Sequence, residues 1–208
     1  AWCAQYFWWQ YKYSQDKKFL KERAYPLFKD ILAFFEDYLK YNENSALYYI
    51  FPDVSPEQGP MTKNSAITLS CLKFLLKVAI KANEILNRDR NDKIRWQNIL
   101  NKFPDYAMGE TIEFGKTIKD SEWAAPDLEL GHPSLLMPIY PIGEISKRDK
   151  DERRKIAINT LKYAQKSLHV STHNFTWLAC AAARLGLGDI TKRAIYERGI
   201  SFMMRSNG

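Results

Sequence analysis

The sequence predicts an all-α protein built of helical hairpins, with short β-hairpin loops at one end. Three observations support this fold class. Apolar residues recur at helical spacing in long runs along the 208 residues. These runs follow one another in pairs that are joined by elaborate loops. The β-compatible pieces, in 47–51 and 105–117, are short and bounded by Pro or Gly, so we expect small hairpins there rather than a large sheet.

The first part of the chain contains two strong helical patterns. In residues 2–14, aromatic side chains recur at helical spacing: Trp2, Tyr6, Trp9 and Tyr13. Asp16 is a suitable N-cap for the next run, residues 17–41, whose apolar residues follow one helical face. Pro26 within that run removes a backbone donor, so we expect the helix to end or kink there.

The remaining helices are bounded by caps and breakers. Thr62 or Asn64 is expected to cap a helix that reaches about Leu86. Helix-period patterns predict further helices over the approximate ranges 90–103, 151–168, 174–185 and 189–204. Pro104 is expected to stop the first of these, because its ring cannot continue a helix.

Residues 121–141 interrupt the helical pattern and form a candidate site. Glu122 lies next to Trp123. Further carboxyl and imidazole groups follow in the same stretch: Asp127, Glu129 and His132. Loops rich in ionisable and aromatic residues often carry function, and a carboxyl beside an indole can keep its proton near neutrality. The same composition also fits a surface connection in which Pro and Trp only pack.

Two shorter stretches carry polar groups that suit a cavity wall. Residues 42–63 are expected to form an extended loop, and Glu57 in it is a candidate ligand-binding residue. A turn rich in Pro and Ser has the same composition with no role. His173, next to the expected helix cap Asn174, is a further candidate, although a lone His at such a position is more often solvated or capping.

Composition narrows the classes of function. The net charge is +7, but the densest basic cluster, residues 147–155, is interleaved with acids, so we expect no nucleic-acid partner. No apolar run is long enough to span a membrane. Cys3, Cys71 and Cys180 lie in apolar helical runs without metal-ligand spacing, which predicts buried free thiols and no metal. The high aromatic content suits stacking on sugar rings as well as a large core.

Several segments keep, in order, the motifs of a known family. Asp16, Phe19 and Leu20 are similar to a "T-G-D-x-x-F-L" turn, and residues 24–29 to "A-Y-P-L-x-K". Residues 54–58 are similar to an "S-P-E-N" loop. Ser121-Glu122-Trp123 resembles "Q-E-W", and residues 177–189 resemble "W-x-x-x-x-W-A-R-L-G-D-G-D". Together they resemble the catalytic domain of glycoside hydrolase family 95, the α-L-fucosidase and α-L-galactosidase family.

The resemblance implies the fold, the reaction and the site. It implies that residues 1–208 form part of an (α/α)6 toroid, a catalytic domain truncated at both ends. It implies inverting hydrolysis of a terminal fucoside-like or galactoside-like sugar of a glycan, without a metal or other cofactor, in a periplasmic or secreted protein. Glu122 is the implied general acid, with Asp127 and Glu129 as alternatives if the register differs. The expected substrate-binding residues are Trp123, His132, Glu57, His173 and Trp177.

The sequence also departs from this family. Only the first His of its "H-R-H-x-S-H" segment is kept, as His132, which suggests a different sugar or a relative outside the fucosidases. The family's water-activating residues would lie before Trp2 and after Gly208, so we expect this chain alone to be inactive. A non-enzymatic helical scaffold and an inactive sugar-binding relative remain alternatives. Clustering of residues 53–58, 121–132 and 171–174 around one mouth would favour the enzyme.

Overall fold

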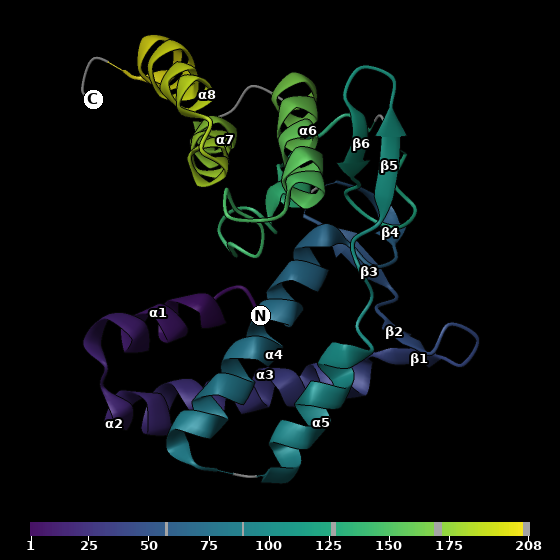
Figure 1. The fold of residues 1–208 in the computed structure, drawn as a ribbon, viewed down its shortest axis with the longest axis vertical. Helices are drawn as coiled ribbons and strands as arrows, with labels where there is room; N and C mark the ends of the chain where they lie inside the picture. The colour runs from purple at the N-terminus through teal and green to yellow at the C-terminus, as the bar shows by residue number, and fades with distance from the viewer. Residues whose placement is uncertain (57, 89, 126–127, 169–171, 206–208) are drawn as a thin grey trace. The chain divides into compact units, whose positions relative to one another are not determined.

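The computed structural model describes residues 1–56, 58–88, 90–125, 128–168 and 172–205 of the chain. These residues form mainly α-helices, joined by short antiparallel strand pairs (Figure 1), so the predicted mainly helical fold class is confirmed. The chain divides into two compact units. Unit 1 comprises Ala1–Phe51 and Thr68–Asp105, and unit 2 comprises Pro52–Ile67 and Tyr106–Gly208.

Unit 1 is built from helices and one strand pair. Its elements are α1 (Ala4–Ser14), α2 (Lys17–Phe19), a π-helical turn (Leu20–Ala24), α3 (Tyr25–Tyr38), β1 (Lys40–Asn42), β2 (Leu47–Tyr49), most of α4 (Ala66–Leu86) and α5 (Arg90–Asn101). The predicted cap is confirmed, because Asp16 Oδ1 accepts backbone N–H bonds from Lys18 and Phe19 at 2.8 and 3.0 Å. Pro26 lies at the start of α3, directly after the π-helical turn, so the helical backbone continues past it with a changed hydrogen-bond pattern and does not end there.

Helix α1 does not bury its aromatic stripe. Tyr6 is 56% and Tyr13 90% exposed, whereas Ala4 and Tyr11 are buried. The helix therefore packs on the face that carries Ala4, because the spacing of seven residues places Ala4 and Tyr11 on one side. The prediction of three buried thiols is likewise wrong for Cys3, which is exposed just before this helix, and Cys180 is only partly buried. Cys71 in α4 is buried, and burial raises the pKa of its thiol to about 12.

An ionic network ties α5 to α3. Asp92 receives Lys29 Nζ and Arg95 Nη2, each at 2.7 Å. Arg95 Nε also binds Glu36 at 2.8 Å, and Glu36 accepts a hydrogen bond from Trp96 Nε1 at 2.7 Å. Burial by itself would raise the pKa of Asp92, but the hydrogen bonds and charges of Lys29 and Arg95 outweigh it and hold this pKa below its ordinary value of 3.8.

This depressed pKa predicts a loss of stability in acid. The unfolded chain takes up a proton on Asp92 near pH 3.8, whereas the folded chain does so only at lower pH, so stability falls as pH falls through the folded pKa. The substitution Lys29→Met removes one cause of the shift. We expect urea denaturation between about pH 6 and about pH 3 to show a shallower loss of stability in this variant than in the wild type. Equal slopes would contradict the role given to Lys29.

Unit 2 contains residues 121–141, called here the proline-rich stretch, together with hairpins and helices. It contains β3 (Asp53–Ser55), β4 (Gln58–Thr62), β5 (Met108–Thr111), β6 (Gly115–Ile118), α6 (Asp151–Ser167), α7 (Thr172–Leu185), α8 (Gly188–Arg193) and a π-helical segment (Ala194–Met203). The β5–β6 hairpin lies beside α6 (Figure 1), where the Ile118 backbone N–H donates to Thr160 Oγ1 at 2.9 Å. The short hairpins predicted from 47–51 and 105–117 are thus confirmed.

The second half of the proline-rich stretch is part of the core of unit 2. Leu130 is fully buried, and so are apolar side chains within and directly after the short 3-10 turn Ser134–Leu136. The fully buried side chains of this stretch are Leu130, Leu135, Leu136, Met137 and Ile139. The alternative of a surface connection is therefore wrong for residues 133–139, whereas Trp123 and Glu129 of the same stretch are exposed.

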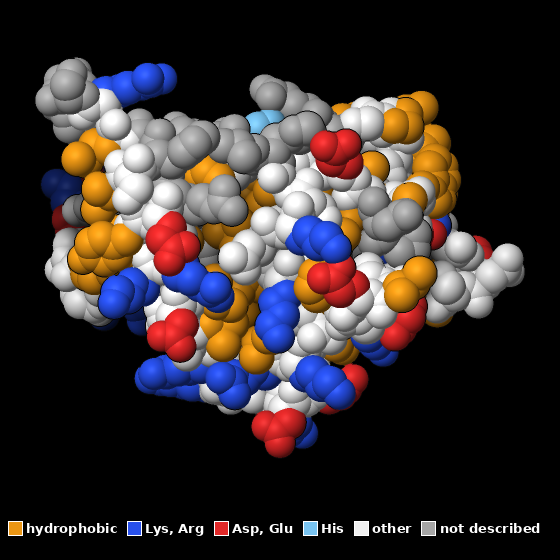
Figure 2. Space-filling model, turned by 90° about the horizontal axis from the view of Figure 1, so that it is seen from above, with side chains coloured by type: hydrophobic (Ala, Val, Ile, Leu, Met, Phe, Trp, Pro, Cys, Tyr) orange, Lys and Arg blue, Asp and Glu red, His pale blue; other side chains and the backbone are white. Residues whose placement is uncertain are grey.

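Two further features concern the surface and the caps. The predicted caps of α4 are wrong, because Thr62 belongs to β4 and the helix begins later, at Ala66. On the face shown in Figure 2, Lys and Arg side chains are interleaved with Asp and Glu. Within the described ranges, every helix is too short or too polar to cross a membrane.

Candidate functional site

Glu122 is held by contacts to both its side chain and its backbone. Its Oε1 atom lies 2.8 Å from Lys63 Nζ, and its Oε2 accepts a hydrogen bond from Asn64 Nδ2 at 2.7 Å. Its backbone N–H donates to the Lys63 carbonyl at 3.0 Å, and its carbonyl accepts from Lys119 Nζ at 3.0 Å. These contacts fix the orientation of the carboxyl. Because the side chain is 39% exposed, the carboxyl is still reachable from solvent.

The turn between β4 and α4 explains why Lys63 and Asn64 meet Glu122. Asn64 has a φ of 52°, a left-handed conformation that Asn adopts more readily than most residues. Around it, Thr62 Oγ1 donates to Ser121 Oγ at 2.7 Å, and the Ala66 N–H donates to the carbonyl of Asp120 at 2.8 Å. Residues 62–66 therefore lie alongside residues 120–122, with their polar groups facing each other.

Asp120 joins this pair of segments to the buried proline-rich stretch. Its side chain is only 5% exposed, and Oδ1 accepts a short hydrogen bond from the Ser134 hydroxyl. Because Ser134 begins the 3-10 turn, this bond fixes residues 120–122 against the core of unit 2. Asp120 thus supports the orientation of its neighbour Glu122.

Unit 2 contains a hollow of about 220 Å³. Ser121 and Trp123, the residues before and after Glu122 in the sequence, line it together with Asp120 and Thr62. The Trp123 side chain is 59% exposed. An indole with an open face suits packing against the apolar face of a ring-shaped ligand.

Two predicted binding residues, His132 and His173, are brought into direct contact. His132 Nδ1 and His173 Nε2 are 2.7 Å apart, and the ring centroids are 4.8 Å apart. Next to this pair, fully buried Asn174 donates to the Gly131 carbonyl at 3.0 Å. Trp177, one turn further along α7, donates from Nε1 to the Tyr140 carbonyl at 2.8 Å. The first turns of α7 therefore hold the segment 131–140.

The three loop regions singled out in the sequence form one connected series of contacts within unit 2. Asp53 Oδ2 accepts from the Ser65 N–H at 2.8 Å, which places 53–55 next to the segment that contacts Glu122. Asp120 links that segment to Ser134, and His132 links the same stretch to His173. These contacts connect the three loop regions within unit 2.

The remaining predicted residues are placed as follows. Glu57 and Asp127 lie outside the described residues. Glu129 is exposed. Among the residues that the structure describes, no group of three or more His, Cys, Asp or Glu side chains is arranged to hold a metal ion.

Sequence reasoning missed the partners of Glu122. Lys63 is 59 residues away along the chain, so no periodicity or local motif connects the two. Asn64 was noticed only as a possible helix cap, a role that explains its residue type without revealing its contact. Ser134 gave no stronger signal than any other polar residue of a loop.

Comparison with known proteins identifies the class of protein to which this site belongs. The description of the matching family model is glycosyl hydrolase family 95 catalytic domain, and the match covers residues 1–203. The chain therefore belongs to glycosyl hydrolase family 95, and the resemblance recognised in its motifs is confirmed.

Curated relatives show similarity along most of the chain. It is 27% identical over 196 residues to alpha-L-fucosidase 2 of Arabidopsis thaliana, covering 89% of this chain and 22% of the relative. It is 25% identical over 194 residues to the periplasmic/secreted acid trehalase ATH1 of Candida glabrata, covering 90% of this chain and 15% of the relative. Periplasmic acid trehalase ATC1 of Saccharomyces cerevisiae (strain CEN.PK113-7D) is 24% identical over 194 residues, with the same coverage of 90% and 15%. The chain thus spans less than a quarter of the length of these relatives.

Proposed function

We propose that this chain is part of a glycoside hydrolase that removes a terminal sugar from a glycan with inversion of configuration, and that Glu122 is its general acid. The observation that carries the assignment is the carboxyl of Glu122, which Lys63 and Asn64 hold at 2.8 and 2.7 Å while the residues on either side of it in the sequence, Ser121 and Trp123, line a hollow. Membership of the family supports a glycosidic bond as the substrate. The names of the relatives support a sugar of the fucoside or trehalose kind, and the family resemblance adds the galactoside kind.

The contacts of Glu122 stabilise its carboxylate, the form that remains after an acid has donated its proton. In inverting hydrolysis, a carboxylic acid protonates the leaving oxygen while a separate base activates water on the other face of the sugar. When Glu122 gives up its proton it becomes an anion, and the Lys63 ammonium at 2.8 Å stabilises that charge as it develops. The Asn64 amide, fixed by its own turn, keeps the carboxyl in one orientation.

We assign the remaining candidate residues to substrate binding. Trp123 supplies an apolar face for the sugar ring, and the His132–His173 pair is assigned to the same substrate. Trp177 and Glu57 complete the proposed set. The proposed mechanism uses no metal ion or other cofactor.

The wider proposal concerns the whole domain and its location. We place both units in one (α/α)6 toroid, of which this chain supplies about half the helices, as the family resemblance implies. The general base is expected outside residues 1–208, so the isolated chain should not turn over substrate. The periplasmic and secreted relatives support export of the protein from the cytoplasm.

The product stereochemistry tests this function. The full-length protein is incubated with an aryl α-L-fucoside, an aryl α-L-galactoside and trehalose, and the first sugar released is observed by proton NMR. We expect at least one substrate to give the β-anomer, because a single displacement at an α-glycoside inverts the anomeric carbon. For the aryl glycosides, initial release of the α-anomer would contradict inversion. For trehalose, inversion gives one α-glucose and one β-glucose, because the leaving glucose keeps its configuration, and α-glucose alone would contradict it. Binding without hydrolysis would favour an inactive sugar-binding relative, and neither binding nor hydrolysis would favour a helical scaffold.

A further inference from the structure

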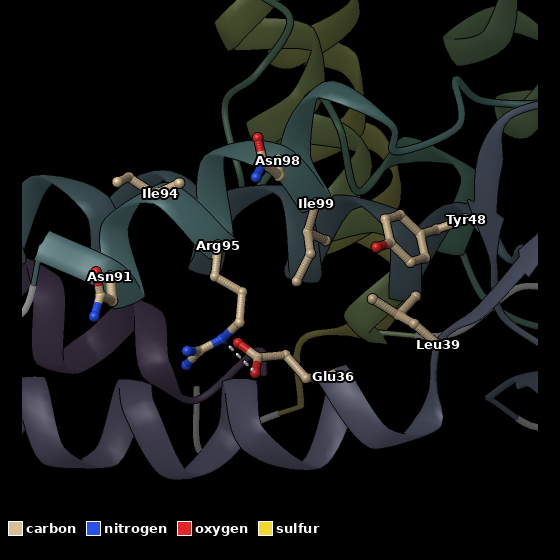
Figure 3. Close-up of a pocket in the computed structure, with 8 residues that line it drawn as sticks. All are labelled: Glu36, Leu39, Tyr48, Asn91, Ile94, Arg95, Asn98 and Ile99. Atoms are coloured by element: carbon tan, nitrogen blue, oxygen red, sulfur yellow. Dashed lines mark hydrogen bonds and ion pairs between the residues drawn. The ribbon is translucent and has the colours of Figure 1, made fainter.

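Unit 1 contains an open hollow of about 650 Å³ between α3 and α5, next to β2 (Figure 3). In Figure 3, Arg95 and Ile99 extend from α5 toward α3, and the Tyr48 hydroxyl points toward Ile99. Ile99 is only 5% exposed and provides, with Leu39, an apolar base. Both the volume and the mixed apolar and polar lining are typical of small-molecule sites.

The charged groups in and behind the hollow neutralise one another. Both oxygens of Glu36 are occupied, one by Arg95 Nε at 2.8 Å and the other by Trp96 Nε1 at 2.7 Å. Arg95 is bound in turn by Asp92, which also pairs with Lys29. Two cations therefore face two carboxylates, and the site has no net charge to attract an ionic ligand. Burial would lower the pKa of Arg95, but Glu36 and Asp92 outweigh it and hold this pKa above its ordinary value.

Other polar groups of the hollow are available to a ligand. Among the described residues, the Tyr48 hydroxyl and the side-chain amides of Asn91 and Asn98 have no hydrogen-bond partner. These three groups can both donate and accept hydrogen bonds. The hollow thus combines neutral hydrogen-bonding groups with an apolar base and one aromatic ring.

We propose that this hollow is a second glycan-binding site, which holds one uncharged sugar unit. A sugar ring has hydroxyl groups that donate and accept, and C–H faces that pack on apolar and aromatic side chains, so it matches both parts of the lining. A ligand with a net charge would lose its hydration without meeting an opposite charge. This site requires no hydrolysis and involves unit 1 only, whereas Glu122 and its partners lie in unit 2.

Methyl-labelled isoleucines test the site directly. The full-length protein, carrying Glu122→Gln to prevent turnover, is labelled with carbon-13 at the isoleucine δ1 methyl groups. It is then titrated with methyl galactoside, and separately with methyl galacturonate, which differs by a carboxylate in place of the hydroxymethyl group. We expect methyl galactoside to shift the Ile94 and Ile99 signals saturably, and methyl galacturonate to bind at least about tenfold more weakly. The Ile118 signal, from buried β6 of unit 2, serves as the internal control.

Two substitutions separate specific binding from a general effect. Tyr48→Phe removes only the hydroxyl, and Asn98→Ala removes an exposed amide, so neither should disturb folding. We expect each to weaken methyl galactoside binding by about fivefold, the usual effect of one neutral hydrogen bond. Absence of shifts at both isoleucines, equal binding of the galacturonate, or unchanged affinity in both variants would overturn the proposal. Because the readout is binding in unit 1, failure here leaves the proposed hydrolysis to be judged by its own test.

Discussion

The substitution Glu122→Gln in the full-length protein is expected to lower kcat by about two to four orders of magnitude, the contribution of a positioned general acid. Gln keeps the size of the side chain and can still bond to Asn64, but it has no acidic proton for the leaving oxygen. Substrate binding should be retained because the shape of the site is preserved. The measurement is kcat on the substrate found active in the stereochemical test, together with calorimetric binding of the product sugar.

Glu84→Gln provides a matched control for this prediction. The Glu84 side chain is 37% exposed and lies 2.8 Å from Lys93 Nζ, whereas that of Glu122 is 39% exposed and lies 2.8 Å from Lys63 Nζ. Loss of an exposed ion pair alone should leave kcat unchanged. Lys63→Met should lower kcat more than it changes KM, because the ammonium acts on charge that develops in the transition state. Normal activity of Glu122→Gln, or an equal loss in the control, would remove Glu122 from the mechanism.

The largest effect on stability is expected at Phe28 in α3. Its side chain is fully buried, so Phe28→Ala should lower the free energy of unfolding by about 3–5 kcal/mol through lost burial and the cavity that remains. Urea denaturation followed by far-ultraviolet circular dichroism measures this change in the full-length protein.

Phe34 on the same helix is the control for that measurement. Its side chain is 61% exposed and stacks on Tyr38, with ring centroids 5.6 Å apart. Phe34→Ala should therefore cost about 1 kcal/mol, the value of an aromatic pair at the surface. Similar losses in the two variants would mean that the burial pattern of α3 differs from the one described.

The candidate site could be predicted only in part. The sequence singled out Glu122, Trp123, His132 and His173 as residue types that suit sugar chemistry, and the structure joins the two histidines at 2.7 Å. The sequence did not indicate that Lys63 and Asn64 hold the Glu122 carboxyl, because this contact forms only when two segments 59 residues apart pack together. The stretch 121–141 carried two opposite hypotheses, and the burial of residues 133–139 showed that this part of it belongs to the core of unit 2.

The sequence by itself determined the helices, the Asp16 cap, the short hairpins and the family. These signals are local or ordered along the chain, because periodicity, capping and turn residues act on their immediate neighbours. Only the tertiary structure decided which face of α1 is buried, which cation meets Glu122, and where the neutral hollow of unit 1 lies. Such features depend on how distant segments pack. That packing is set by the free energies of burial and pairing summed over the whole chain, and a local pattern does not contain them.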